Sequence, residues 1–250
     1  MTRAPGDPTM RPVPPTDDAT ARITAVRETI AAAARRAGRD PATVGLIAVT
    51  KTLPPAAVNV ALDAGIEDIG ENYVQEGEHK REAVGRPATW HLIGGLQRNK
   101  VSAAVRTFDW VHSVDSERLA RALDAAAAAS GRRIPVLIQV NLSGASGQRG
   151  AEPDAVEPLA EVLLGCGALR LQGLMTIAPA DAARPELRGH FRRTSRLRDE
   201  VAKRLGVELP HLSMGMSDDF SLAVEEGATL VRLGRALFGP RGSRSWREGA

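Results

Sequence analysis

The sequence predicts a single (β/α)8 barrel of the TIM type, with one extra helix at its start. The chain has 250 residues, which is the length that eight strand–helix units need. Short apolar runs alternate with helical patterns, and no linker rich in proline, glycine or serine interrupts them after residue 40. The same alternation also suits an open, doubly wound sheet, which is the structural alternative.

The two ends of the chain are expected to lie outside this barrel. The first 20 residues contain five prolines and lack the apolar segment of an export signal, so residues 1–20 are predicted to be a disordered tail. Ile23, Val26 and Ile30 then recur at helical spacing, which predicts a helix over residues 21–36. We expect the barrel to span residues 21–243, and residues 244–250 to form a short C-terminal tail.

Eight short apolar runs are predicted to be the barrel strands. In order they are residues 46–50, 68–72, 90–94, 110–113, 135–141, 171–177, 211–214 and 229–233. Helical patterns lie between them at residues 55–64, 74–83, 98–105, 116–130, 153–164, 186–205 and 218–226. Several of these helices begin at a capping residue such as Ser116 and end at a glycine such as Gly131 or Gly206.

Composition narrows the class of function. The formal net charge is only +3, and the chain has three Trp, one Tyr and four Phe, so we do not expect it to bind nucleic acid. No apolar run approaches the roughly 20 residues that span a bilayer, so membrane insertion is not expected. The single cysteine, Cys166, allows neither an internal disulfide nor a Cys-based metal site, which fits a cytoplasmic protein.

Lys51 is the first candidate site residue. It follows the apolar run of residues 46–50, and Pro54 and Pro55 come soon after it. The carboxyl ends of barrel strands form the ligand-binding rim, and a partly desolvated lysine amine can form a Schiff base there. The simpler alternative is a strand-end lysine that points to solvent.

Two further loops on this rim are predicted to bind a phosphate group. Residues 213–217, with the sequence Ser-Met-Gly-Met-Ser, end the seventh strand and precede a helix, so hydroxyl and backbone N–H groups converge there. Gly234 and Arg235 follow the eighth strand, and loops after strands seven and eight often bind phosphate in such barrels. A capped helix with a tight turn is the alternative.

Three more polar residues lie within or just after predicted strands. Arg232 stands between Val231 and Leu233, where an unpaired guanidinium would be costly, so it needs an acceptor in the barrel mouth. That acceptor is either a ring nitrogen of a ligand or the partner in a buried ion pair. Asn72 and His91 can contact a ligand or satisfy neighbouring backbone groups.

Together these features suggest pyridoxal 5′-phosphate (PLP) as the ligand. A lysine able to form an imine, two phosphate-binding loops and a central arginine match its aldehyde, its phosphate and its ring nitrogen. A barrel that binds another phosphorylated ligand would use the same loops but would not need Lys51.

Seven segments of the chain resemble a known family. They are residues 48–52 (AVTKT), 70–76 (GENYVQE), 90–100 (WHLIGGLQRNK), 139–143 (QVNLS), 173–175 (GLM), 212–219 (LSMGMSDD) and 231–239 (VRLGRALFG). In these segments the chain is similar to the pyridoxal phosphate homeostasis protein family. The resemblance implies a barrel like the N-terminal domain of alanine racemase.

The resemblance also implies roles for particular residues. Lys51 would hold PLP as a Schiff base, Arg232 would face the pyridine nitrogen, and Asn72 would lie close to the cofactor. Phosphate contacts would come from Ser213, Met214, Ser217, Gly234 and the backbone at Arg235. Members of the family are known as cytoplasmic PLP carriers that buffer vitamin B6, and apo forms of PLP-dependent enzymes are the expected recipients.

Two positions depart from the family pattern. Arg235 stands where many relatives carry Thr or Ser, so the phosphate contact there comes from a guanidinium or from the backbone alone. Gln148 and Arg149 stand where some bacterial members have a lysine proposed as a second PLP acceptor. Transfer of PLP through a lysine in the loop over residues 144–150 is therefore in doubt.

The sequence favours a carrier over an enzyme. Racemisation on PLP needs a base on each face, and in alanine racemases the second base is a tyrosine from a separate C-terminal domain across a dimer. The chain reaches Ala250 without that domain, and its only tyrosine, Tyr73, is expected to pack beside Asn72. Arg232 at the pyridine nitrogen would also weaken the ring as an electron sink. We expect a monomer without catalytic turnover, with a slow PLP-dependent amino-acid racemase as the alternative.

Overall fold

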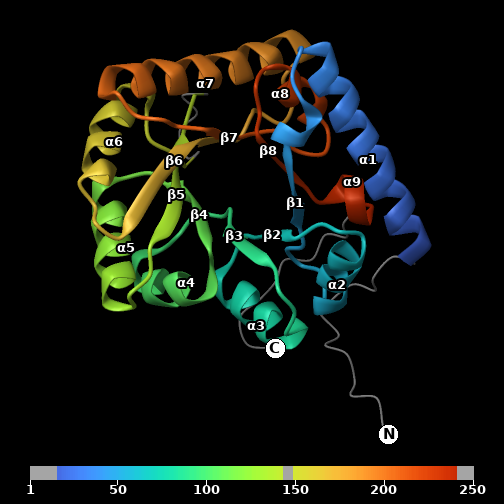
Figure 1. Ribbon diagram of the computed structural model, residues 1–250, viewed down its shortest axis with the longest axis horizontal. Helices are drawn as coiled ribbons and strands as arrows, with labels where there is room; N and C mark the ends of the chain where they lie inside the picture. Colours follow the sequence, from blue (N-terminus) through green and yellow to red (C-terminus); the bar gives the residue numbers. More distant parts are fainter. Residues whose placement is uncertain (1–15, 143–148, 241–250) are drawn as a thin grey trace, which may run out of the picture.

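Eight parallel strands close into a barrel in the computed structural model, which describes residues 16–142 and 149–240 (Figure 1). The strands are β1 (Gly45–Val49), β2 (Asp68–Glu71), β3 (Thr89–Leu92), β4 (Trp110–Val114), β5 (Ile134–Val140), β6 (Leu169–Thr176), β7 (His211–Ser213) and β8 (Leu230–Leu233). Each strand pairs with the next one in the sequence, and β8 pairs with β1. The predicted (β/α)8 barrel is thus confirmed, and the open sheet is ruled out.

Helices form a ring outside these strands, with α7 along the top of Figure 1 and α1 along its right side. They are α1 (Thr16–Arg36), α2 (Pro55–Asp63), α3 (Val74–Val84), α4 (Val101–Thr107), α5 (Glu117–Ala129), α6 (Val156–Leu164), α7 (Arg184–Leu205), α8 (Phe220–Glu225) and α9 (Arg235–Phe238). Short 3-10 helices are η1 (Pro41–Thr43), η2 (Arg98–Lys100) and η3 (Pro153–Ala155). The helix predicted over residues 98–105 is therefore η2 followed by α4, and α9 was not predicted.

The helix α1 begins earlier than the sequence predicts. It starts at Thr16, so the prediction of a disordered tail over residues 1–20 is wrong for residues 16–20. Ala19 is fully buried, and Asp18 forms an ion pair with Arg22 one turn later at 2.7 Å, which explains why these residues continue the helix. Residues 1–15 and the predicted tail at residues 244–250 lie outside the described residues.

The helix α8 begins later than predicted. Its first residue is Phe220, whereas the pattern predicts a start at residue 218. The carboxylate of Asp219 accepts a hydrogen bond from the backbone N–H of Met216 at 2.5 Å, so the residues before Phe220 form a turn. This turn belongs to the rim of the barrel, where the site lies.

The inside of the barrel is partly polar. A small apolar cluster of Ile47, Leu137, Met175 and Leu230 fills part of it. Because side chains alternate along a strand, Arg232 on β8 points into the barrel while its neighbours pack outward against the helices. His91, His112 and Ser213 are also buried there. The main apolar core lies between the strands and the helices.

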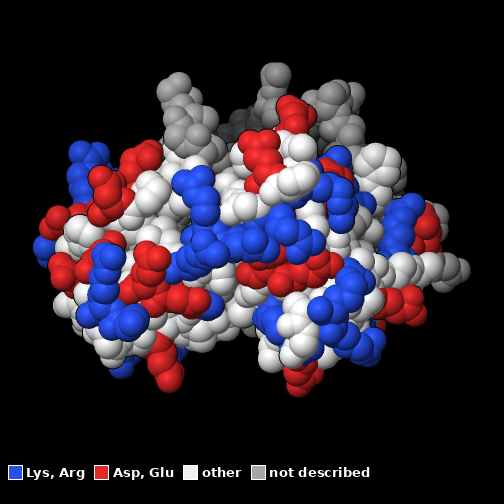
Figure 2. Space-filling view, turned by 90° about the horizontal axis from the view of Figure 1, so that it is seen from above, with Lys and Arg blue, Asp and Glu red and all other residues white. Residues whose placement is uncertain are grey.

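Basic and acidic side chains lie together on the α7 side of the molecule, which Figure 2 shows as a blue band beside red residues. Arg188 contacts Glu226 at 2.6 Å and Arg192 contacts the same carboxylate at 3.0 Å. Two of the arginines on α7, Arg188 and Arg192, are thus paired with Glu225 of α8 and with Glu226, the residue that follows it. Within residues 16–142 and 149–240, no helix has the length and apolar character needed to cross a membrane.

Gly173 allows β6 and β7 to pack closely. Its φ angle is 146°, and a Cβ atom there would lie 1.9 Å from the carbonyl oxygen of His211. We predict that Gly173→Ala lowers the free energy of unfolding by about 2–4 kcal/mol, because one of the two strands must move. Chemical denaturation measures this effect.

Gly189→Ala is the matched control for this prediction. Gly189 lies in α7, and nothing lies within 4 Å of the position of its Cβ atom. We expect this variant to be as stable as the wild type or more stable by up to about 1 kcal/mol, because alanine favours the helix. Equal stability of the two variants would contradict the role assigned to Gly173.

Candidate functional site

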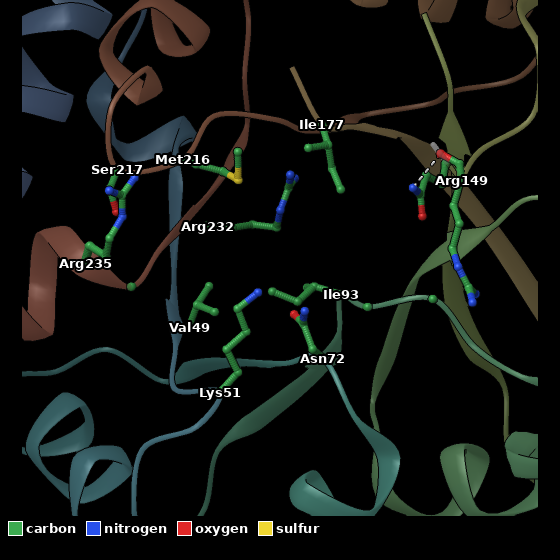
Figure 3. A pocket seen from close by; sticks show the side chains of 14 residues that line it. Val49, Lys51, Asn72, Ile93, Arg149, Ile177, Met216, Ser217, Arg232 and Arg235 are labelled. Atoms are coloured by element: carbon green, nitrogen blue, oxygen red, sulfur yellow. Dashed lines mark hydrogen bonds between the residues drawn. The ribbon is translucent and has the colours of Figure 1, made fainter. Parts of the chain in front are cut away.

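A cavity of about 470 Å³ opens at the carboxyl ends of the strands (Figure 3). It is lined by Val49, Lys51, Asn72, Ile93, Gly94, Gly95, Gln139, Arg149, Ile177, Met216, Ser217, Arg232, Gly234 and Arg235. Six of the eight predicted site residues therefore line the same cavity. The other two, Ser213 and Met214, do not line it.

Lys51 lies two residues after the end of β1 and is half-buried. Figure 3 shows its amine pointing into the cavity on the same side as Asn72, with Arg232 across from them. The alternative of a lysine that points only to bulk solvent is thus not what the structure shows. A partly buried amine at the end of a strand suits reversible covalent chemistry with a carbonyl group.

A buried ion cluster holds the backbone on both sides of Lys51. The amine of Lys80 on α3 donates to the carbonyl oxygen of Thr50 at 2.7 Å, to Glu71 at 2.6 Å and to Glu76 at 2.8 Å. Glu71 also accepts from the hydroxyl of Thr50 at 2.5 Å. All three ionisable side chains are fully buried, so the contacts are shielded from water.

The same cluster stabilises an unfavourable backbone angle next to Lys51. Thr52 has a φ of 64°, and it is the only residue other than glycine with a positive φ among residues 16–142 and 149–240. A β-branched side chain is strained in this conformation. The backbone N–H of Thr52 donates to Glu76 at 2.5 Å, which offsets part of that strain. Lys51 thus lies in a turn, and the residues on either side of it, Thr50 and Thr52, are both bound to this buried cluster.

The charges in this cluster do not balance when both carboxylates are ionised. The pKa of Glu71 is raised to about 7, chiefly by burial and also by the charge of Glu76, while Lys80 acts in the opposite direction. One oxygen of Glu71 and one of Glu76 accept no hydrogen bond from any described residue. A proton held by Glu71 would neutralise the cluster, so its charge is expected to change near neutral pH.

The two loops predicted to bind phosphate meet at one end of the cavity. The hydroxyl oxygen of Ser217, after β7, accepts a hydrogen bond from the backbone N–H of Ala236, after β8, at 3.1 Å. Gly234 lines the cavity beside them. The guanidinium of Arg235 pairs with Asp218, and both side chains are largely exposed. This pairing favours the backbone at Arg235, over its side chain, as a contact for an anion.

Ser213 and Met214 do not line the cavity, and their contact with phosphate stays a prediction. Both side chains are fully buried and lie behind the wall of the cavity. The hydroxyl of Ser213 is used by Arg232 and His112, and the backbone N–H of Met214 donates to the carbonyl oxygen of Leu230 in the strand ladder. These bonds use the hydroxyl of Ser213 and the backbone N–H of Met214 within the barrel.

Arg232 lies on the floor of the cavity and is 5% exposed. Its terminal nitrogens donate to the hydroxyl of Ser213 at 2.7 Å and to the carbonyl oxygen of Thr176 at 2.9 Å. Burial lowers the pKa of its guanidinium to about 10, and the nearby Asp219 acts in the opposite direction. The side chain is thus cationic at neutral pH, and two of its five N–H groups are used in these two bonds.

His91 does not reach the cavity, although the sequence allows it a contact with the ligand. Its ring is 2% exposed inside the barrel and contacts Asp68 and His112. Asn72 does line the cavity, and Gly94 lets the chain pass close to it, because a Cβ atom there would lie 2.2 Å from the carbonyl oxygen of Asn72.

The apolar part of the lining was not identified from the sequence. It includes Val49, Ile93 and Ile177. Strand periodicity predicts burial at such positions but does not distinguish the cavity wall from the core. Arg149 also lines the cavity, whereas most of the loop discussed for a second acceptor, residues 143–148, lies outside the described residues.

Comparisons with known proteins agree with this geometry. The family model described as "Alanine racemase, N-terminal domain" matches residues 22–242. A pyridoxal phosphate homeostasis protein from Pseudomonas aeruginosa is 46% identical over 220 residues, which cover 88% of this chain and 94% of that protein. Another with the same name from Escherichia coli K12 is 38% identical over 239 residues, 90% of this chain and 97% of that protein.

A solved structure is also similar. It is PipY of Synechococcus elongatus PCC7942 with PLP bound, which is 37% identical to this chain. The match has a TM-score of 0.79 and covers 88% of this chain and all of PipY. The two proteins are thus similar in sequence as well as in fold.

The buried cluster beside Lys51 leads to a prediction about pH. The raised pKa of Glu71 means that the folded protein binds a proton more tightly than the unfolded chain. This stabilisation is complete below the ordinary pKa of glutamate and is lost as the pH rises through about 7. We therefore expect the free energy of unfolding of Glu71→Gln, relative to that of the wild type, to rise by about 1–3 kcal/mol between pH 5 and pH 8.

Chemical denaturation at several pH values measures this difference. Glu82→Gln, at an exposed position on the same helix as Lys80, is the control and should show no such trend. A constant difference between Glu71→Gln and the wild type from pH 5 to pH 8 would show that Glu71 does not hold the extra proton.

Proposed function

The chain belongs to the pyridoxal phosphate homeostasis protein family, and we propose that it binds PLP in the cavity at the barrel rim. Its role is then to hold PLP on Lys51 as a Schiff base and to take part in the homeostasis of intracellular PLP, which is vitamin B6 in its active form. The observation that carries the proposal is the arrangement of Lys51, Arg232 and the Ser217 loop around one cavity.

The residues present fit the chemical groups of PLP. The hydroxyl of Ser217 and the backbone at Gly234 and Arg235 are available for the phosphate at one end. The amine of Lys51 is available for the aldehyde, and Arg232 for the ring nitrogen. Asn72 lies beside Lys51 and is available for a polar contact with the cofactor.

PLP supplies a reactive aldehyde and an electron-withdrawing ring when it is bound. Lys51 is the residue that would hold the aldehyde, through its amine in the unprotonated form and with the release of water. The cluster around Lys80 orients the turn from which Lys51 acts. The reaction is reversible by water, which suits a protein that must release its ligand.

Arg232 supports a carrier over an enzyme. Its guanidinium is cationic at neutral pH, because burial lowers its pKa only to about 10. A cationic donor next to the pyridine nitrogen disfavours protonation of that nitrogen, and an unprotonated ring is a weaker electron sink. Tyr73, the only tyrosine in the sequence, is 45% exposed and does not line the cavity. We infer that carbanion chemistry on PLP is slow here.

The setting of this function is part of the same proposal. We place the protein in the cytoplasm, where its single cysteine needs no oxidising compartment. Apo forms of PLP-dependent enzymes are the proposed recipients of PLP, and we expect the protein to act as a monomer. A slow PLP-dependent amino-acid racemase is the alternative function.

The covalent part of the proposal is tested by the absorption spectrum of the purified protein with PLP. We expect a visible band that borohydride removes, with the reduced pyridoxyl group on Lys51 alone among the four lysines Lys51, Lys80, Lys100 and Lys203. Lys51→Ala should lose the reducible adduct and bind PLP at least about tenfold more weakly.

Lys203→Ala, which changes an exposed lysine on α7, is the control and should behave like the wild type. Retention of PLP by Lys51→Ala with the wild-type affinity would contradict the covalent role of Lys51. A wild-type protein that never binds added PLP would contradict the function as a whole and favour another phosphorylated ligand.

Proton exchange at the α-carbon of alanine separates the carrier from the racemase. In deuterated water with protein and PLP, we expect exchange no faster than with the same concentration of free PLP, because the ring is a weak electron sink beside Arg232. Proton NMR follows the loss of the α-proton signal. Faster exchange that disappears in Lys51→Ala would favour the racemase.

A further inference from the structure

A chain of hydrogen bonds crosses the inside of the barrel from the cavity to the opposite end. Arg232 donates to the hydroxyl of Ser213 at 2.7 Å, and that oxygen lies 3.0 Å from Nδ1 of His112. Nε2 of His112 lies 3.0 Å from Nδ1 of His91, and Nε2 of His91 lies 2.9 Å from Oδ1 of Asp68. The five residues come from β8, β7, β4, β3 and β2.

The three central members of this chain are isolated from water. His112 and Ser213 are at most 1% exposed, and His91 is 2% exposed. Asp68 differs, because its side chain is 36% exposed and lines a second cavity of about 450 Å³ at the amino ends of the strands. The chain therefore connects the floor of the proposed PLP site to a carboxylate at the far end of the barrel.

The surroundings of His112 favour a neutral ring. Burial, followed by the charges of His91, Arg232 and His211, holds the pKa of His112 well below its usual value. His91 stacks on Trp110 with ring centres 5.8 Å apart. A neutral imidazole has one N–H donor and one acceptor nitrogen. The role of one nitrogen therefore fixes the role of the other, and so links the hydrogen bonds on the two sides of the ring.

The carboxylate of Asp68 selects one direction for the whole chain. It can only accept, so Nε2 of His91 must carry a proton, and Nδ1 of a neutral His91 must then accept. Nε2 of His112 must then donate to His91, which leaves Nδ1 of His112 as an acceptor for the hydroxyl of Ser213. The oxygen of Ser213 is thereby left to accept from Arg232.

The reverse direction is unfavourable while Asp68 is ionised. It would place the lone pair of Nε2 of His91 against a carboxylate oxygen at 2.9 Å. It would also turn Nδ1 of His112 into a second donor to the oxygen of Ser213, beside Arg232, and the hydroxyl proton of Ser213 would lose its acceptor on His112. Without the carboxylate, this penalty at the far end of the chain disappears.

We propose that Asp68 is a positioning residue for Arg232, because it sets the direction of the hydrogen bonds that hold the guanidinium on the floor of the ligand cavity. The effect on PLP rests on the proposed function. The direction of the chain is a property of the protein alone and is measurable without a ligand.

The first test is the tautomeric state of the histidines in the protein without PLP. Long-range ¹H–¹⁵N NMR correlations should show His91 and His112 as Nε2–H tautomers in the wild type. Asp68→Asn keeps the shape of the side chain but offers both a donor and an acceptor, so His91 and His112 should populate both tautomers. Glu67→Gln, which removes an exposed charge one residue earlier at the same cavity, should leave the tautomers unchanged.

The second test is the dissociation constant of PLP, measured by absorption titration. Glu67→Gln should bind like the wild type, and Asp68→Asn should bind about three- to tenfold more weakly, because Arg232 is held less firmly. A matched comparison of thermal unfolding shows whether Asp68→Asn is folded. If it is not, Asp68→Ser, which keeps a polar side chain without the charge, takes its place in both tests.

Each outcome decides the proposal. Unchanged tautomers in the Asp68 variant, or a doubly protonated His91 in the wild type, overturn the claim that Asp68 sets the direction. Mixed tautomers with unchanged PLP affinity overturn the claim that this direction positions Arg232. A wild type that binds no PLP overturns the proposed function instead, and the tautomers of the protein without ligand then still confirm or overturn the direction of the chain.

Discussion

The buried amine of Lys80 is the contact on which the site depends. It joins α3 to the end of β1 through Thr50 and to the end of β2 through Glu71. A fully buried lysine is stable only when its donors are satisfied, and here all three have oxygen acceptors. Breaking one of these contacts would leave buried charge unpaired, which is costly. The cluster therefore resists movement of the backbone that it binds. Lys51 extends from the turn that this cluster holds.

The inside of the barrel shows a second use of buried polar groups. Barrels of this class are usually filled by branched apolar side chains, but here histidines, a serine and an arginine occupy much of the interior. Their hydrogen bonds link strands that are distant in the sequence, as for His112 and Ser213, which are 101 positions apart. A fully bonded interior of this kind is rigid, which suits a site that must hold a cationic group at a defined place on its floor.

Much of the fold was predictable because its signals are local. Each strand is a short apolar run, and each rim residue follows such a run, so the positions of Lys51, Asn72 and Gly234 follow from the strand assignments. The errors arose where tertiary contacts decide. Residues 16–20 are helical because Ala19 packs against the barrel, and α9 depends on a hydrogen bond from Ala236 to Ser217. Neither contact leaves a pattern in the neighbouring sequence.

By itself the sequence determined the order of strands and helices, the polar rim and the presence of a lysine, an arginine and two phosphate-type loops on that rim. Periodicity and strand ends are properties of adjacent residues, which is why they are visible without coordinates. Only the tertiary structure decided that Ser213 faces Arg232 and not the cavity, and that Asp68, His91 and His112 form one chain. The contact between His112 and Ser213 joins β4 to β7 across the barrel, which the pairing of β8 with β1 closes. The direction in which each side chain points there is set by packing across the barrel.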